Sequence, residues 1–304
     1  MLANFFGKSN PANYIIIFTV FVCYFAAELF LEFSQEKQWL WLASILGLFV
    51  LLFFFFNFIL AKNKLTLYNS YGFLFFVLLF GMFPFTIFDR QELLVNVILL
   101  IMLRRVYSLR TPKAVIKKMF DSGFWLSILF ILEPFTLVFG LLIYISILFF
   151  QKLTLRSALI PVVGFLTPLA CYFSYCFYED NVDGFLQLFA WYTDYDFGFY
   201  TSQKIMIPLI FVGAITLLSI LFKTPRVFLI SGNYRKFWSL TILNLLVAIG
   251  YVALAKDRNG AELMATFFPV AVILTNGVES FSKAFFRDVI LGVFVLIPIV
   301  VFIT

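Results

Sequence analysis

The sequence contains no histidine, and only three of its 304 residues are cysteine. The absence of histidine excludes histidine-based metal sites, histidine general bases and histidine proton relays. Cys23, Cys171 and Cys176 all lie in apolar segments without a CxxC or other metal-binding spacing, which indicates a packing role. The chain also lacks a Walker lysine motif and a GxGxxG motif after a strand, so neither nucleotide-binding pattern is present.

Charged residues are also scarce, at 12% of the chain against roughly 25% in soluble domains. Hydrophobic residues make up 63%, phenylalanine alone contributes 45 residues, and the mean hydropathy is +1.03. This composition predicts an all-α, polytopic transmembrane helical bundle that forms a single integral membrane domain over residues 1–304. The lipid bilayer is its first expected partner. Nucleic acid is not expected, because the basic residues behind the net charge of +6 lie beside the predicted spans.

The predicted membrane segments follow the apolar runs of the sequence. The first run is a signal-anchor helix, because no small-residue cleavage site follows it. The predicted spans are residues 14–32, 39–61, 70–88, 92–104, 123–150, 157–177, 203–222, 238–255, 262–278 and 286–303.

The run 123–150 differs from the others, because Glu133 and Pro134 stand in its middle. One continuous helix of this length would extend about 42 Å, well beyond a hydrocarbon core of about 30 Å. Proline also removes a backbone donor, and an ionised glutamate at mid-bilayer costs at least ~2.5–3.5 kcal/mol. We therefore predict a broken helix or hairpin at 123–150, which crosses twice or re-enters and gives about 10–11 membrane segments in total.

The distribution of positive charge favours the hairpin. When 123–150 counts as two passes and the N-terminus is cytoplasmic, 17 of the 22 Lys and Arg residues face the cytoplasm. One continuous helix would leave only 12 of them there. We therefore predict that the N-terminus lies inside and the C-terminus outside.

Two segments between the spans carry most of the remaining information. The basic segment 104–121, "RRVYSLRTPKAVIKKMFD", is predicted to be a cytoplasmic loop that anchors the topology or binds a lipid phosphate or a partner. The segment 178–204 is predicted to be a periplasmic acidic–aromatic loop. Its Trp191, Tyr192, Asp194 and Asp196 suit a sugar, because aromatic rings stack on C–H faces and carboxylates accept hydroxyl protons. The same composition is typical of an interfacial helix.

Other carboxylates are predicted at the outer ends of the spans. Glu28 and Glu32 are four residues apart and would share one helix face, where they could bind a divalent cation or activate a hydroxyl. Helix-end acids that face water are the alternative. Asp89, in "FDRQE", is a candidate second acid or part of a local ion pair. Glu133 would contact a substrate or only cap the turn of the hairpin.

The segments "FFGKSNPANYI", "KNKLTLYNSYGFLFFVLL" and "FDSGFWLSILFILEP" together resemble an uncharacterised family of multispan inner-membrane proteins from Bacteroidota. This resemblance covers nearly the whole chain. It implies a location in the bacterial inner membrane and a multi-pass topology rather than a biochemical role.

The order of features is also similar to the GT-C glycosyltransferases, integral-membrane enzymes that take sugars from polyprenyl-phosphate carriers at the outer face. The basic segment before the broken helix pair, the loop 178–204 and the late stretch "RNGAELMATFFPVAVIL" carry this second resemblance. It implies a polyprenyl-phosphate partner and a catalytic role for Glu28, Glu32 and Asp89. It also implies that Glu133, the 178–204 loop and Arg258 bind substrate, with Arg258 on the carrier phosphate. The sequence departs from that pattern in its first outer loop, which has only about six residues.

Three functions therefore stay open at the level of sequence. A transferase would use the carboxylates and loop just named. A transporter or flippase would use the break at Glu133–Pro134 as a midplane site, since discontinuous helices commonly form such sites. A non-catalytic subunit or scaffold of an envelope complex would bind other membrane subunits through its aromatic-rich flanks.

Overall fold

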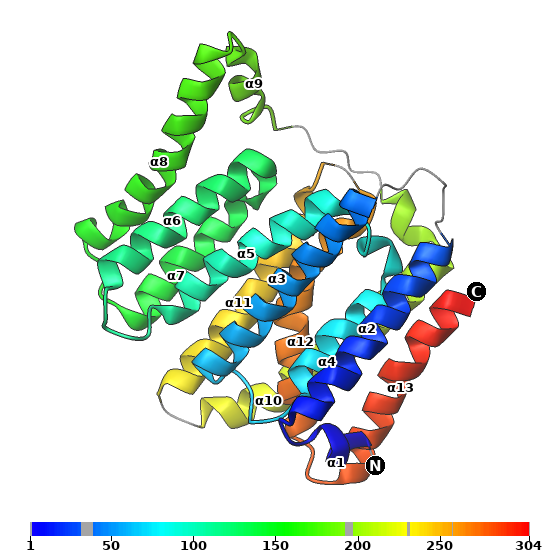
Figure 1. Cartoon of the computed structure of the whole chain (residues 1–304). Coiled ribbons are helices and arrows are strands. Elements are labelled where there is room, and N and C mark those ends of the chain that lie inside the picture. Colours follow the sequence, from blue (N-terminus) through cyan, green and yellow to red (C-terminus); the bar gives the residue numbers. More distant parts are fainter. Residues whose placement is uncertain (1, 32–38, 192–196, 230–231, 257, 304) are drawn as a thin grey trace.

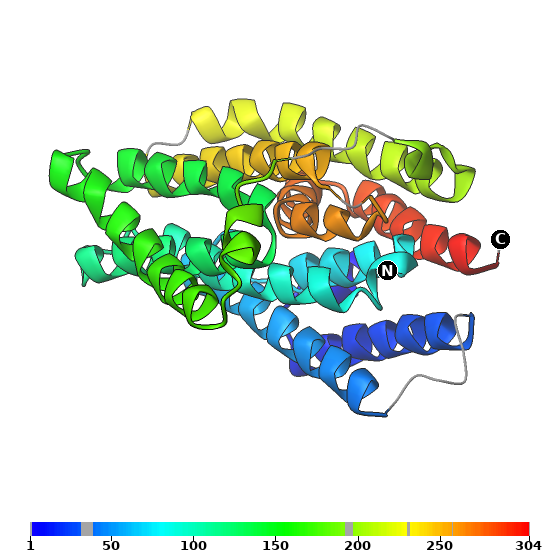
Figure 2. The same ribbon diagram turned by 90° about the horizontal axis from the view of Figure 1, so that it is seen from above.

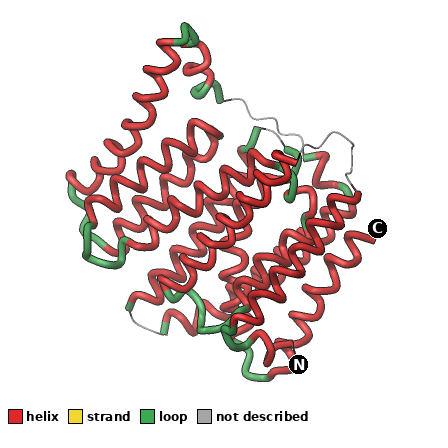
Figure 3. Tube along the Cα trace, viewed as in Figure 1, coloured by secondary structure: helices red, strands yellow, loops and turns green. Residues whose placement is uncertain are grey.

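The computed structural model of the protein describes residues 2–31, 39–191, 197–229, 232–256 and 258–303. In these residues every regular element is a helix, so the predicted all-α fold is confirmed (Figures 1 and 3). The long helices are α2 (Pro11–Leu31), α3 (Trp39–Asn63), α4 (Tyr71–Met82), α5 (Arg90–Ser108), α6 (Val115–Leu132), α7 (Gly140–Phe150), α8 (Leu155–Tyr178), α10 (Gln203–Phe228), α11 (Asn233–Leu254), α12 (Met264–Glu279) and α13 (Ala284–Ile303). The short elements are α1 (Leu2–Phe6), α9 (Val182–Gln187) and the 3-10 turns η1 (Pro84–Thr86), η2 (Pro134–Phe139), η3 (Gly198–Thr201) and η4 (Ala261–Leu263).

The lengths and compositions of the helices fit a polytopic membrane protein. Within the described residues, seven helices are long and apolar enough to cross a membrane: α2, α3, α8, α10, α11, the unit Ala261–Glu279 and α13. Tyr71–Met82 and Pro134–Phe150 are shorter apolar helices. The chain is therefore a multi-pass helical bundle whose natural surroundings are a lipid bilayer.

The region 123–150 folds back on itself as predicted. Helix α6 ends at Leu132, Glu133 adopts an extended conformation, and Pro134 opens η2, which leads into α7. The carbonyl of Glu133 accepts hydrogen bonds from the backbone amide and hydroxyl of Thr136, at 3.0 and 2.6 Å, so the turn satisfies its own backbone. Gln151, at the far end of α7, donates through Nε2 to the carbonyl of Leu109, just before α6. The two arms therefore run antiparallel.

The first arm of this hairpin is longer than the hydrophobic pattern indicated. Helix α6 begins at Val115, eight residues before the predicted start at Gly123. Its first turns carry Lys117, Lys118 and Asp121, and these charges hid the helix from a search for apolar runs. The basic segment 104–121 is correspondingly less of a loop than predicted, because α5 continues to Ser108.

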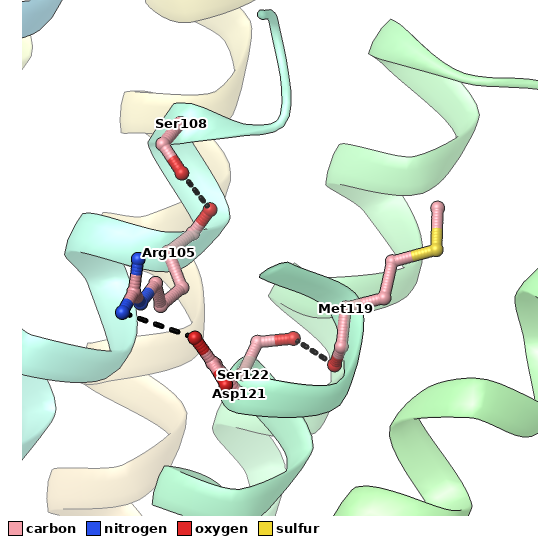
Figure 4. A network of polar contacts seen from close by, with 5 residues as sticks. All are labelled: Arg105, Ser108, Met119, Asp121 and Ser122. Carbon is pink, nitrogen blue, oxygen red and sulfur yellow. Dashed lines mark hydrogen bonds and ion pairs between the residues drawn. The ribbon is translucent and has the colours of Figure 1, made fainter. Parts of the chain in front are cut away.

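Charged contacts hold α5 and α6 together in this basic segment. Arg105 of α5 forms an ion pair with Asp121 of α6 at 3.0 Å (Figure 4). Lys118 donates through Nζ to the carbonyls of Ser108 and Thr111, at 2.8 and 3.0 Å. The basic residues therefore join two helix ends rather than lie in a long free loop.

The loops gather at two opposite ends of the bundle. One end, here called the basic end, contains α1 and segments 64–70, 109–114, 151–154 and 280–283. Hydrogen bonds link these segments, as when Glu279 accepts from Leu67 N at 2.9 Å and Arg226 donates to the carbonyl of Ser280 at 2.7 Å. Successive long helices thus run in opposite directions between the two ends of the bundle (Figure 1).

The other end, here called the acidic end, contains segments 83–89, 179–191, 197–202 and 258–263 together with Glu133. The ring centres of Phe85 and Phe199 are 5.4 Å apart. Those of Trp191 and Phe135, which lies two residues after Glu133, are 5.9 Å apart. The segment 178–204, predicted as a loop, contains α9 and η3. The two termini lie toward opposite ends of the bundle, while the side of the membrane on which each end lies stays a prediction.

Two helices form the centre of the bundle. All residues of α4 are buried, and 94% of the Ala261–Glu279 window is buried. Seen from above, α12 lies between α4, α10 and α11 (Figure 2), which it contacts. Phenylalanine fills the adjacent core, as in the stacked pair Phe56 and Phe76, whose ring centroids are 4.0 Å apart. At about 18 Å, α4 is shorter than the hydrocarbon core, but the surrounding protein shields it from lipid.

Helices α6 and α8 cross at very short range. A methyl group on Gly123 would lie 3.0 Å from Cα of Pro161 and closer still to its carbonyl group. A methyl group on Gly164 would similarly lie 3.2 Å from Cα of Phe120. Small residues allow such close backbone approach between membrane helices. The crossing is therefore possible only because both positions are glycine.

Candidate functional site

Asp89 holds the start of α5 and joins it to the segment after α11. Its Oδ1 accepts a hydrogen bond from the backbone amide of Glu92 at 2.8 Å, which makes it the N-terminal cap of the helix. Its Oδ2 accepts from Nδ2 of Asn259 at 2.7 Å. Both carboxylate oxygens of this predicted acid therefore contact the protein, which gives Asp89 a clear positioning role.

Glu92, one turn into α5, is surrounded by other carboxylates. Its Oε1 accepts a hydrogen bond from the hydroxyl of Tyr251 at 3.0 Å, whereas its Oε2 is buried and has no hydrogen-bond partner. Asp89, Glu133 and Glu262 all lie close enough for their charges to interact with it. These four residues, Asp89, Glu92, Glu133 and Glu262, are here called the acidic cluster.

Glu262 is the most deeply buried member of the acidic cluster, with only 1% of its surface exposed. It lies in η4, and its Oε1 accepts a hydrogen bond from the hydroxyl of Tyr200. Its Oε2 is buried without a partner. Burial, and then the hydrogen bond to Glu262, raise the pKa of Tyr200 well above its ordinary value, so this phenol stays protonated and remains a donor.

Arg258 supplies positive charge beside Glu262 and Tyr200. Its guanidinium lies 3.9 Å from the centre of the Phe197 ring, and Nη2 donates to the carbonyl of Ala253 at 2.9 Å. Its Nη1 is buried and has no hydrogen-bond partner. The guanidinium is thus held in place with one donor still to be satisfied, which suits an anion.

An apolar cavity of about 490 Å³ adjoins this polar group. Phe197 and Tyr200 line one part of it, and the remaining wall consists mainly of aliphatic and aromatic side chains from α10, α11 and α12. Leu217 and Ile249 also line it, and they are 62% and 50% exposed, so the cavity opens on the face of the bundle between α10 and α11. In a bilayer that face contacts lipid.

The structure brings together some of the residues predicted from sequence. Asp89, Glu133 and Arg258 all lie at the acidic end, where Arg258 interacts with Glu262, and Asp89 and Glu133 interact with Glu92. Trp191 packs against Phe135, two residues after Glu133, and is about half exposed.

Other predicted residues are placed less completely. Glu28 is buried in α2, one turn after Phe25. The ring centres of Phe25 and Phe88 are 5.1 Å apart, and Phe88 directly precedes Asp89. Glu32, Tyr192, Asp194 and Asp196 lie outside the described residues. Among the described residues, no group of three or more His, Cys, Asp or Glu side chains could hold a metal ion.

The sequence placed Glu92 beside Asp89 in "FDRQE" and Tyr200 in the acidic–aromatic loop 178–204, but assigned neither a role of its own, and it gave no role to Glu262 or Tyr251. Glu262 lies in "RNGAELMATFFP", whose Arg or Glu before a proline-containing span was part of the GT-C resemblance, so a signal for it existed. Tyr251 carries no local signal, and for both tyrosines only the fold shows which carboxylate they contact.

No curated protein and no solved structure matches this chain. A family model described as a family of unknown function (DUF6427) matches residues 1–304, and the chain therefore belongs to that family.

Proposed function

We propose that the protein transfers a sugar from a polyprenyl-phosphate-linked donor at the acidic end of the bundle. The observation that carries this proposal is the position of Tyr200, which lines the apolar cavity and also donates a hydrogen bond to Glu262. A single ligand with a long hydrocarbon chain and a polar head could therefore occupy the cavity and reach the acidic cluster. Polyprenyl-phosphate sugars have this combination of properties.

The phosphate of such a donor would lie next to Arg258. The unpartnered Nη1 of this residue provides a charge-assisted hydrogen bond, and its contact with Phe197 places it beside the cavity. Arginine pairs with phosphate through its planar group of donors. Arg258 would thus bind the carrier phosphate, as the sequence predicted, and stabilise it as the leaving group.

Glu262 is the carboxylate best placed to act as the general base. Its Oε2 would accept the proton of the acceptor hydroxyl, while Tyr200 fixes the other oxygen. The hydroxyl oxygen would form a bond to the anomeric carbon as the bond from that carbon to the phosphate oxygen breaks. The electron pair leaves with the polyprenyl phosphate, whose charge Arg258 balances.

Two carboxylates of the acidic cluster have supporting roles in this proposal. Asp89 would position the segment that carries Arg258, through its hydrogen bond to Asn259. Glu133 would contribute to binding of the acceptor. The catalytic role predicted for Glu28 and Glu32 stays a prediction, and a divalent cation between them would be an addition to this site.

The proposal can be tested in membrane vesicles that contain the protein, incubated with a radiolabelled polyprenyl-phosphate hexose. We expect Glu262→Gln to lower the transfer of label by about 100-fold or more, which is typical for loss of a general base. Arg258→Gln should lower it as well. Glu179→Gln is the matched control, because Glu179 lies exposed at the same end and its loss should leave transfer unchanged.

Two results would contradict this assignment. Full transfer by Glu262→Gln at an unchanged protein level would remove Glu262 as the base, and parallel tests of Glu28→Gln and Glu32→Gln would then examine the sequence prediction. Transfer no greater than in vesicles without the protein would argue against a transferase. A constant stoichiometric protein partner on purification, without bound polyprenyl lipid, would instead favour a subunit or scaffold.

The structure lends less support to a transporter with a midplane site. Helix α6 has 18 residues and is about 27 Å long, so Glu133 lies at an end of the bundle rather than at its midpoint. Tyr251, which interacts with Glu133, and Trp191, which packs against Phe135, belong to the same end.

A further inference from the structure

A second groove lies at the opposite end of the bundle, between α6 and α8. It has a volume of about 880 Å³ and begins below the close crossing of the two helices at Gly123 and Gly164. Its lining residues come from the N-terminal halves of these two helices. The apolar wall of the groove consists of Ile116, Phe120, Leu155, Leu159, Ile160 and Val163.

Two cations complete the lining of this groove. Lys117 lies in the first turn of α6, and Arg156 lies in the first turn of α8. Both side chains are exposed, and no described residue forms an ion pair or hydrogen bond with either of them. The nearby acid Asp121 is already paired with Arg105 (Figure 4). The groove therefore combines a long apolar wall with unbalanced positive charge at one end.

These positions are unfavourable for cations unless an anion is present. The first turn of a helix carries the positive end of the helix dipole, so acidic side chains are favoured there and basic ones are not. Helices α6 and α8 both begin at this groove, and each places a cation in its first turn. A bound anion would reverse the penalty at both helices at once.

We propose that this groove binds an anionic phospholipid from the leaflet at the basic end of the bundle. The lipid phosphate would lie between Lys117 and Arg156, and an acyl chain would follow the apolar wall toward the glycine crossing. A phospholipid is the favoured occupant because, beside the two cations, the groove is surrounded by exposed apolar side chains, including Leu155 at 79% and Val163 at 55%. The inference does not depend on the proposed sugar transfer, which concerns the other end of the molecule.

Native mass spectrometry of the full-length protein in detergent tests this proposal, with dioleoyl phosphatidylglycerol as the probe and dioleoyl phosphatidylcholine as its zwitterionic counterpart. A basic residue near an anionic lipid surface contributes roughly a fivefold preference. Lys117→Gln combined with Arg156→Gln should therefore weaken phosphatidylglycerol binding by about 30-fold and leave phosphatidylcholine binding unchanged. Lys64→Gln combined with Lys283→Gln removes the same charge at the same end, away from the groove, and should have little effect.

A second variant tests the apolar part of the site without a change in charge. Leu159→Trp fills the groove, and we expect it to lower the binding of both lipids. The preference of the protein for phosphatidylglycerol over phosphatidylcholine should stay the same. Equal binding of the two lipids by the wild type would overturn the proposal, as would an unchanged preference in the variant that lacks both cations. Displacement of all phosphatidylglycerol by an equal concentration of polyprenyl phosphate would also overturn it, because the carrier lipid would then be the natural occupant.

Discussion

Replacing Gly123 with alanine tests the close crossing of α6 and α8, on which the hairpin and the lipid groove both depend. The added methyl group would lie 3.0 Å from Cα of Pro161 and closer to the carbonyl carbon and oxygen. All three neighbours are backbone atoms, so no side-chain rotation can relieve the contact. The helices must therefore move apart.

The size of the effect follows from this geometry. Non-bonded carbon atoms rest about 3.5–4.0 Å apart, and the carbonyl atoms are nearer to the methyl group than Cα is, so the helices must separate by more than about 1 Å. Overpacking of this kind costs ~1–3 kcal/mol. Because the contact is with backbone atoms, the cost lies at the upper end of this range. The better helix propensity of alanine returns ~1 kcal/mol, which leaves a net destabilisation of about 2 kcal/mol. Gly164→Ala should have a similar effect. The double variant should lose less unfolding free energy than the two single variants together, because one separation of the helices relieves both contacts.

The buried thiol of Cys176 on α8 provides the assay. Cys23 and Cys171 are exposed and can be changed to serine, so that a thiol-reactive dye reports only the loosening of Cys176 during a thermal ramp. Gly250→Ala is the matched control, because a methyl group there would meet no atom within 4 Å. If Gly123→Ala and Gly250→Ala unfold at the same temperature, or if Gly123→Ala is the more stable, the close crossing is refuted.

Three further predictions concern the acidic end and the topology. Asp89→Ala removes the cap of α5 and the hydrogen bond from Asn259, so thermal unfolding should show a free energy of unfolding lower by ~1–2 kcal/mol. Asp89→Asn retains a good cap and should lose less stability. Equal losses in the two variants would contradict the capping role. Burial and Glu262 raise the pKa of Tyr200, so its stabilising contribution is complete below about pH 10 and is lost as the pH rises above that value. Unfolding measured at about pH 9 and pH 11 should therefore show a larger loss of stability for the wild type than for Tyr200→Phe, and equal losses would exclude this contribution. Single cysteines at positions 64, 152 and 179 of a cysteine-free chain should react with an impermeant maleimide on intact cells only at position 179; reaction at position 152 but not at position 64 would contradict the hairpin.

Much of the fold could be predicted because the bilayer constrains the sequence strongly. The hairpin followed from one acid–proline pair in an overlong apolar run, and from the distribution of lysine and arginine. Helix boundaries were predicted less well where polar residues belong to helices. Lys117, Lys118 and Asp121 lie on α6, and the ion pair that accommodates Asp121 involves Arg105 on another helix. A linear search for apolar runs cannot detect such a pair.

The candidate site was less predictable, because its members come from segments far apart in the chain. Glu92 belongs to the first third of the chain, whereas Tyr251 and Glu262 belong to its last third. The sequence favoured Glu28 and Glu32 because their spacing is visible within one helix. Hydrogen bonds between α5, α11 and the η3 and η4 turns instead select Glu92 and Glu262, and these bonds exist only in the folded chain.

The two ends of the bundle carry unsatisfied polar groups of opposite charge. At the acidic end several carboxylates interact, and Arg258 and two tyrosines offset them only in part, so two carboxylate oxygens remain buried without a partner. At the basic end Lys117 and Arg156 lie in the first turns of their helices, where the helix dipole disfavours them. Unsatisfied groups of opposite sign at opposite ends, each beside an apolar groove, fit a protein that binds lipids in both leaflets. We therefore expect loss of the acidic-end ligand and loss of the basic-end lipid to be separable by mutation, since no residue belongs to both sites.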